Sequence, residues 1–251
     1  VFLDEHLDRL YDGAEQLAID IGKNRDELAG MIQETLDANK MRTGVHIRLI
    51  VSRGLKKTPY QHPIANTGKS SIVIIPEHKE SDKKINKEGI SLVTVTTRRG
   101  TPNSQDPRVN SLSKHNCIAA CIEADRAGAD EGIMLDIHGN IATCNSTNFF
   151  IVRKGEVWTS SGEFCLPGIT REVVINLCVE NDIRVFQKDF RIMDVHSAHE
   201  AFVTGTFAGI IPAVEIDSQP MSGGKRGDLT SRIQKIYNEK LAQLYPPKAQ
   251  E

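Results

Sequence analysis

The order of helix-like and strand-like patterns constrains the fold of this chain more than any other feature. Two segments with apolar residues at helical spacing come first, over residues 4–22 and 24–41. Asp4 is the expected N-cap of the first helix, and Gly22 its expected end. Strand-like runs follow in "VHIRLIVSRG", "SSIVIIPE" and "ISLVTVTTRRG". Helices followed by strands predict an α+β unit.

The second half of the chain mixes the same two patterns. We predict a helix over 113–129, a three-stranded antiparallel meander over 130–161 and a helix that starts after Pro167-Gly168. A strand, a glycine-containing turn and a second strand follow over 200–217, and an amphipathic helix covers 229–244. His199 and Glu200 fit a solvent-facing strand entry.

The length of 251 residues is enough for one large domain or two modest ones. The polar stretch "TPNSQDPRVN" contains Pro102 and Pro107 and is the best linker candidate. We therefore predict a small N-terminal α+β domain over 1–100, a linker over 101–109 and a larger C-terminal α+β domain over 110–251. Because Val1 opens on a strand-like pattern, we expect an upstream segment of the small domain to be missing from this sequence.

Composition argues against several classes of partner. Lys and Arg number 31 against 33 Asp and Glu, a net charge of −2, so nucleic acid is not an expected partner. No apolar run approaches the ~20 residues of a membrane span. Five cysteines, an odd number without framework spacing, predict reduced thiols in a cytoplasm. No grouping has metal-ligand spacing, so no metal is predicted.

Two stretches are suited to hold an anion. "LPGITREVV" places Ile169 and Thr170 at a helix start, where backbone N–H groups lack intrahelical partners and the helix dipole is positive. "VTGTFAG" places Thr206 in a tight turn that offers N–H groups and a hydroxyl. Arg9 on the first helix is a possible charged partner. Taken singly, the first stretch also fits a plain helix end, the second a simple glycine turn, and Arg9 a surface arginine.

Six stretches in their order carry a resemblance to a known family. They are "DEHLDRLYDGAE", "VHIRLIVSRG", "AGADEGIMLDIHGNI", "NSTNFFIVRKGEVWT", "LPGITREVVINLC" and "HEAFVTGTFAGIIPAVEID". Together they resemble the fold-type IV enzymes of pyridoxal 5'-phosphate, which include branched-chain and D-amino-acid aminotransferases. The resemblance implies a two-domain D-amino-acid-aminotransferase-like architecture, a cofactor between the domains and a homodimer. It also implies amino-group transfer between a small amino acid and a 2-oxo acid.

The resemblance also implies roles for individual residues. Arg9 matches the arginine that grips the cofactor phosphate, and Ile169 and Thr170 match the helix-start donors to that phosphate. Thr206 matches the threonine that completes the phosphate site. Thr206 and Phe207 match the turn that receives a substrate carboxylate.

At two positions the sequence departs from the family pattern. The lysine that bonds the cofactor is replaced by Asn110 when the spacing of D-amino-acid aminotransferases is used, and by Val109 with the branched-chain spacing. The next lysine, Lys114, lies one helical turn further on, an axial shift of about 6 Å. The glutamate that keeps the pyridine nitrogen protonated is replaced by Thr143, which can only hydrogen-bond that nitrogen.

Three interpretations of these departures stay open. Lys114 could take over as the cofactor-linked lysine of an aminotransferase, since burial would lower the pKa of its amine. The protein could instead be an inactive relative that holds a phosphate-bearing ligand. It could also catalyse another reaction that needs no lysine linkage.

Overall fold

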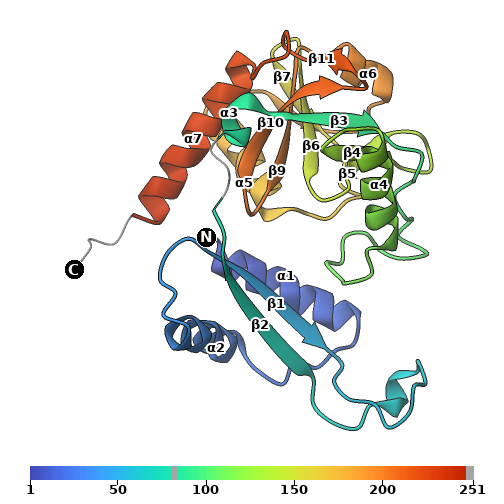
Figure 1. Ribbon diagram of the computed structural model, residues 1–251, viewed down its shortest axis with the longest axis vertical. Helices are drawn as coiled ribbons and strands as arrows, with labels where there is room; N and C mark the ends of the chain where they lie inside the picture. Colours follow the sequence, from blue (N-terminus) through green and yellow to red (C-terminus); the bar gives the residue numbers. More distant parts are fainter. Residues whose placement is uncertain (81–83, 247–251) are drawn as a thin grey trace. The chain divides into compact units, whose positions relative to one another are not determined.

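The computed structural model describes residues 1–80 and 84–246 and contains two compact units (Figure 1). The first unit is Phe2–Glu80, and the second contains Val1 and the chain after Glu80. The sequence had placed the linker at 101–109, about 20 residues later. The division comes earlier because strand β3, Ile90–Thr94, lies in the sheet of the second unit between β4 and β10.

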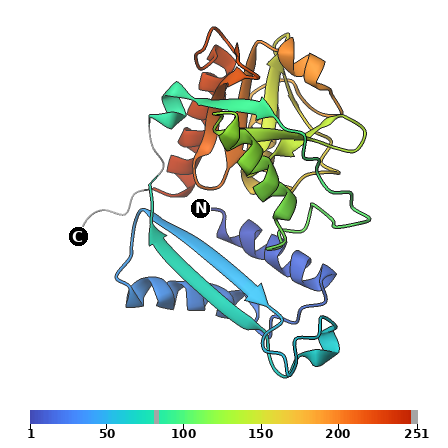
Figure 2. The same ribbon diagram turned by 45° about the vertical axis from the view of Figure 1, so that its right-hand side comes forward.

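The first unit consists of two helices and a hairpin (Figure 2). Its elements are α1 (Leu3–Gln16), α2 (Arg25–Ala38), β1 (Val45–Ser52), a 3-10 turn η1 (Pro63–Ala65) and β2 (Ser71–His78). The strands pair antiparallel along their whole length, with Val45 opposite His78 and Ser52 opposite Ser71. Leu7 and Leu28 are almost fully buried, so each helix contributes its apolar face to a small core.

Local hydrogen bonds set the helix ends in this unit. Asn24 and Glu27 form a reciprocal capping box at the start of α2. The first helix is shorter than predicted, because the Arg53 guanidinium donates to the carbonyl oxygens of Leu17 and Ala18 just beyond its end. Asp4 lies inside the first turn of α1 and is not its N-cap.

The second unit is built on a nine-stranded sheet with the path β5-β4-β3-β10-β9-β6-β7-β8, and β11 pairs with β10. Its strands besides β3 are β4 (Glu131–Leu135), β5 (Ile141–Cys144), β6 (Asn148–Arg153), β7 (Glu156–Thr159), β8 (Val185–Gln187), β9 (Glu200–Gly205), β10 (Gly209–Ile216) and β11 (Gln219–Pro220). Its helices are α3 (Ile85–Glu88), α4 (His115–Arg126), α5 (Ile169–Glu180), α6 (Ile192–His196) and α7 (Asp228–Leu244).

The predicted three-stranded meander over 130–161 is wrong. That segment forms two separate hairpins, β4–β5 and β6–β7, and β6 pairs with β9 instead of β5. The chain bends sharply between the hairpins, where the Glu131 carboxylate accepts hydrogen bonds from Ser146 and Thr147. Burial raises the pKa of Glu131, and these hydrogen bonds oppose that rise.

Helices cover the sheet of the second unit, and apolar packing holds them there. One face carries the main core, which includes Leu92, Ile133, Phe149 and Val203. The buried residues of α5 lie outside that core, and α5 packs against α7 and β9, as Figure 1 shows. No helix within residues 1–80 and 84–246 combines the length and the apolar run that a membrane crossing requires.

The last helix is fastened to the sheet by a carboxylate. Glu200, at the start of β9, accepts hydrogen bonds from Leu229 N (3.0 Å), Thr230 N (2.7 Å) and Thr230 Oγ1 (2.7 Å). These are orphan donors at the positive end of α7, where a negative charge is stabilising. A Cβ added to Gly227 would lie 2.0 Å from the Glu200 carboxyl carbon. The expectation that Glu200 faces solvent is therefore wrong, because its carboxylate caps α7.

A second carboxylate fixes the chain after β3. Glu123 on α4 accepts hydrogen bonds from the backbone N–H groups and hydroxyls of Thr96 and Thr97. The hydroxyls of Thr97 and Thr96, followed by the backbone donors, lower the pKa of Glu123 to about 2. This contact anchors the segment that leads toward residues 110–114.

We expect the stabilising effect of Glu123 to depend on pH. Its folded-state pKa is depressed, so its contribution is complete above the unfolded-state pKa of about 4.3 and is lost as the pH falls toward 2. Glu123→Gln should lower the urea midpoint at pH 7, and the difference from the wild type should shrink as the pH falls from about 5 to about 2. Glu180→Gln, at the end of α5, is the control. A midpoint difference that stays constant with pH would contradict this role.

Candidate functional site

The N-terminal end of α5 presents unsatisfied backbone donors. Gly168 is the N-cap and has no side chain to supply a cap. The first intrahelical hydrogen bond runs from Glu172 N to Gly168 O (3.0 Å), so the N–H groups of Ile169 and Thr170 precede it. Such groups, together with the helix dipole, favour an anion.

Asn148 on β6 lies directly against this helix end. Its Nδ2 donates to Leu166 O (3.0 Å), which holds the loop before the helix. A Cβ added to Gly168 would lie only 2.0 Å from Asn148 Oδ1. Glycine is therefore required at 168 by a close approach, since its φ of −70° suits any residue.

The turn that follows β9 lies beside the same asparagine. Asn148 pairs with Thr204 across the β6–β9 ladder, and Gly205 and Thr206 come next in the chain. A Cβ added to Gly205 would lie 3.5 Å from Thr147 Cγ2, which independently places the turn close to the start of β6. The two stretches that were predicted to bind an anion thus lie close together around Asn148. They are Gly168–Thr170 and Gly205–Thr206.

Thr204 adds an unpaired hydroxyl to this region. It is 2% exposed, and its Oγ1 is buried without a hydrogen-bond partner in the part of the chain that the structure describes. Alternate residues of a strand point to opposite faces, and Val203 belongs to the main core. Thr204 therefore points to the other face of β9, where α5 packs. Thr206 and Phe207 are exposed in the turn itself.

Lys114 and Asn110 are neighbours in the structure. Lys114 Nζ donates to Asn110 Oδ1 at 3.4 Å, so the amine reaches the position where the family lysine was expected. The segment between them is not helical, because α4 begins only at His115. The prediction of a shift by one helical turn is thus wrong in detail. Lys114 is half-buried in this chain, and the depression of its pKa by burial stays a prediction.

Thr143 on β5 is buried, at 4% exposure, and its hydroxyl is already engaged. Thr143 Oγ1 donates to Thr147 O at 2.7 Å. Because a hydroxyl has one proton and two lone pairs, Thr143 can only accept a further hydrogen bond. It would therefore pair with a protonated ring nitrogen, but it carries no charge to keep that nitrogen protonated.

Arg9 lies on α1 in the first unit, one turn after His6. Burial, followed by the neighbouring charge of Arg9, lowers the pKa of His6 to about 4, so the imidazole is neutral at pH 7. Burial also lowers the pKa of Arg9. The positive charge available on this stretch of α1 is therefore that of Arg9. Its convergence with the α5 end stays a prediction.

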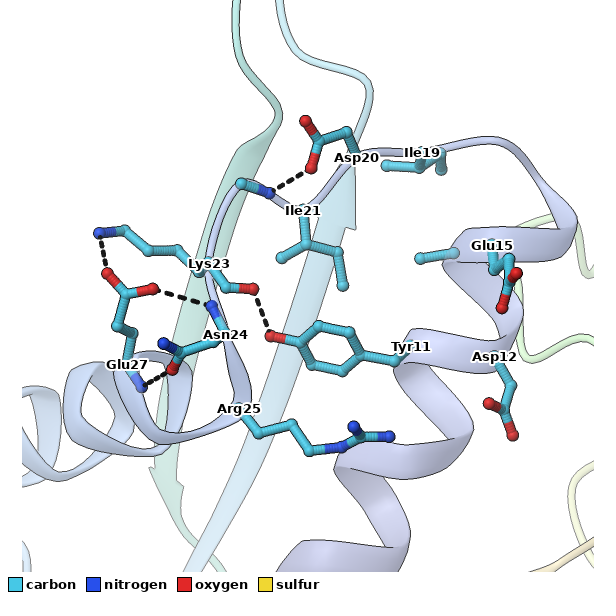
Figure 3. A pocket seen from close by; sticks show the side chains of 12 residues that line it. Tyr11, Asp12, Glu15, Ile19, Asp20, Ile21, Lys23, Asn24, Arg25 and Glu27 are labelled. Carbon is cyan, nitrogen blue, oxygen red and sulfur yellow. Dashed lines mark hydrogen bonds and ion pairs between the residues drawn. The ribbon is translucent and has the colours of Figure 1, made fainter.

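A groove in the first unit contains none of the predicted site residues (Figure 3). It lies between the second half of α1 and the segment that leads into α2. Its polar groups already bond to one another: Tyr11 Oη donates to Lys23 O (2.6 Å), and Lys23 Nζ pairs with Glu27 Oε1 (2.9 Å). Elsewhere too, residues 1–80 and 84–246 contain no group of three His, Cys, Asp or Glu side chains that could hold a metal ion.

Comparison with known proteins decides the family. The model of amino-transferase class IV matches residues 1–216. This chain belongs to the class IV aminotransferase family. A putative branched-chain-amino-acid aminotransferase of Methanocaldococcus jannaschii is 35% identical over 240 residues, which cover 94% of this chain and 81% of that protein. A D-alanine aminotransferase of Listeria monocytogenes is 28% identical over 240 residues, with the same coverage.

One relative is much longer than this chain. Branched-chain-amino-acid aminotransferase-like protein 1 of Arabidopsis thaliana is 38% identical over 237 residues. The match covers 94% of this chain but 42% of the Arabidopsis protein, so the chain spans less than half of that relative.

Solved structures confirm the predicted α+β architecture of the class IV family. The branched-chain aminotransferase of the archaeon Thermoproteus uzoniensis, solved with norvaline, superposes with a TM-score of 0.86 at 28% identity and covers 97% of this chain and 80% of that one. The enzyme of Escherichia coli superposes with a TM-score of 0.86 at 25% identity, with coverages of 98% and 82%. The family assignment and the fold class made from the sequence are thus both confirmed.

Sequence reasoning missed two residues that shape the α5 end of this family member. Arg171 is buried, and its Nη2 donates to Ser160 O (2.8 Å) and Gln187 Oε1 (3.0 Å), which holds the loop before the helix. Tyr237 on α7 is 3% exposed; burial raises the pKa of its phenol, and the neighbouring Thr170 hydroxyl opposes that rise. One sign of a role for Tyr237 was available in the sequence, which is its position four residues after Ile233 on the apolar face of the last helix. A tyrosine on such a face needs a partner for its hydroxyl.

Proposed function

We propose that this protein binds pyridoxal 5'-phosphate and transfers the amino group of a small amino acid to a 2-oxo acid. The observation that carries the proposal is the meeting of three features around Asn148: the open N–H groups of α5, the Gly205–Thr206 turn and the orphan Thr204 hydroxyl. The names of the relatives support the same reaction, with branched-chain amino acids and D-alanine as candidate donors.

The α5 region fits a phosphate group. A buried hydroxyl without a partner costs roughly 1–3 kcal/mol, and a phosphate oxygen would remove that cost at Thr204 Oγ1. The N–H groups of Ile169 and Thr170 and the hydroxyl of Thr206 would supply the other donors. We propose that Arg9 completes this set with a charge-assisted hydrogen bond.

When bound, pyridoxal 5'-phosphate would supply the aldehyde and the electron-withdrawing ring that amino transfer needs. The chain's own contribution centres on Lys114 Nζ, which we assign to proton transfer at the substrate and to linkage with the aldehyde. Asn110, 3.4 Å from that amine, would orient it. Thr143 Oγ1 would accept a hydrogen bond from the ring, and Thr206 with Phe207 would receive the substrate carboxylate.

A second candidate function has its own support. The hydroxyl of Thr143 gives its proton to Thr147 O, and the family's lysine position holds Asn110. A chain with these two residues would hold the phosphate of a ligand and lack the groups for amino transfer. In that case the protein would bind pyridoxal 5'-phosphate reversibly, without turnover.

Replacing Arg9 tests the proposed phosphate site. Arg9→Gln should raise the dissociation constant for pyridoxal 5'-phosphate about 10- to 100-fold, as expected for loss of a charged hydrogen bond of roughly 1.5–3 kcal/mol. Binding of pyridoxal, which has no phosphate, should not change. Titration by protein fluorescence measures both. Arg25→Gln is the matched control, because Arg25 pairs with Asp8 (2.7 Å) on the same unit. Unchanged affinity for the phosphorylated ligand would remove Arg9 from the site.

Replacing Lys114 separates the two candidate functions. The wild type, mixed with pyridoxal 5'-phosphate and reduced with borohydride, should carry a covalent adduct on the peptide that contains Lys114. Lys114→Ala should lose the adduct and the amino transfer but keep phosphate-dependent binding, since the α5 donors remain. Lys235→Ala, an exposed lysine, is the control. Reversible binding with no adduct in the wild type would support the ligand-holding function.

We also infer a homodimer and a cytoplasmic location. Support for the dimer comes from the family and from α4, where Ile118 and Ile122 lie four residues apart on one helix face and are 58% and 45% exposed. Support for the location comes from the five cysteines, all of which are free thiols. Sedimentation should give twice the mass of the chain, and fractionation should recover the protein with cytoplasmic markers. A monomer at micromolar concentration would contradict the dimer.

A further inference from the structure

Glu131, at the start of β4, is a buried carboxylate at the bend between the β4–β5 and β6–β7 hairpins. It is 7% exposed and accepts hydrogen bonds from Ser146 N (3.1 Å), Ser146 Oγ and Thr147 Oγ1 (2.5 Å). Its charged neighbour Asp130 is also negative, and within residues 1–80 and 84–246 no ion pair includes Glu131. A buried charge that lacks an opposite charge is costly, so a cation placed nearby would be stabilised.

Thr147 connects this carboxylate to Thr143. The Thr147 hydroxyl donates to Glu131, and the Thr147 carbonyl oxygen accepts hydrogen bonds from Thr143 Oγ1 (2.7 Å) and Cys144 N (3.0 Å). Thr147 is therefore held through both its side chain and its backbone. Because the proton of Thr143 Oγ1 is used in this contact, the lone pairs of that oxygen are left for a donor.

Thr143 points to the face of the sheet on which α4 packs. Opposite residues of an antiparallel pair share a face, and Thr143 lies opposite Met134. Met134 clusters with buried alanines of α4, whereas Cys144, the next residue in β5, belongs to the main core on the other face. Since α4 begins directly after Lys114, the acceptor of Thr143 and the amine assigned to proton transfer belong to the same side of the sheet.

We propose that Glu131 supplies the negative charge that the ring end of pyridoxal 5'-phosphate requires, and that it acts through Thr147 and Thr143. This inference rests on the proposed function, in which Thr143 Oγ1 accepts a hydrogen bond from the ring. Thr143 has no charge of its own, and the carboxylate on the far side of Thr147 provides one. In the low-dielectric interior such a charge stabilises a protonated ring nitrogen. Because Glu131 touches neither the ring nor the substrate, it is a positioning residue.

Ligands that differ only at the ring nitrogen test this role. Glu131→Gln keeps the shape of the side chain but removes the charge, so it should raise the dissociation constant for pyridoxamine 5'-phosphate about 3- to 20-fold. Binding of the analogue with a C–H group in place of the ring nitrogen should not change. Pyridoxamine 5'-phosphate has no aldehyde to react with a lysine, so titration reports reversible binding. Asp130→Asn is the matched control, because it removes an exposed carboxylate from the preceding residue.

A double variant tests the route through Thr143. Thr143→Val removes the acceptor and should weaken binding of pyridoxamine 5'-phosphate, and adding Glu131→Gln should then cause a smaller loss than it causes alone. Unchanged affinity in Glu131→Gln, an equal loss for the analogue, or additive losses in the double variant would each overturn the role of Glu131. A wild type that binds both ligands equally would overturn this role and leave the proposed function standing. A wild type that binds neither ligand would overturn both.

Discussion

The contact between Asn148 and Gly168 determines where α5 begins, and the candidate site depends on it. Asn148 Oδ1 occupies the space that a Cβ at residue 168 would need, while its Nδ2 holds Leu166 O at 3.0 Å. Asn148 is also a ladder residue of β6 opposite Thr204. The orientation of the helix end is thereby set by a residue of the sheet. A loop alone could not keep the α5 donors and the Thr206 turn in a constant arrangement.

The sequence predicted those parts of the structure whose signals are local. Helical spacing located α2, α5 and α7, and the Gly-containing turn after β9 was recognised from its residues. Strand pairing was predicted less well, because β6 pairs with β9 through contacts between residues about 50 positions apart, and no local pattern specifies that partner. The prediction that Glu200 faces solvent was wrong for the same reason, since its hydrogen-bond partners Leu229 and Thr230 lie about 30 positions further along the chain.

The local structure around the predicted site residues was predicted only in part. The positions of Ile169 and Thr170 at a helix start and of Thr206 in a turn were predicted, because helix ends and glycine turns have a sequence signature, and the roles of these residues in ligand binding stay predictions. Thr204 was missed because a threonine inside a strand looks ordinary, and only the structure shows that its hydroxyl is buried without a partner in the described chain. The distance between Lys114 and Asn110 was also not predictable, because the segment between them is an irregular loop.

The ring of Tyr237 fills the space beside the bare backbone of Gly209, and this has a consequence for sequence variation. Gly209 has a φ of +68°, which disfavours any other residue, and the aromatic ring leaves no space for a methyl group there. A smaller residue at 237 would leave a void, and a larger one at 209 would collide with the ring. A smaller residue at 237 would remove the collision but not the strain of the positive φ, so glycine is expected at 209 whatever residue stands at 237.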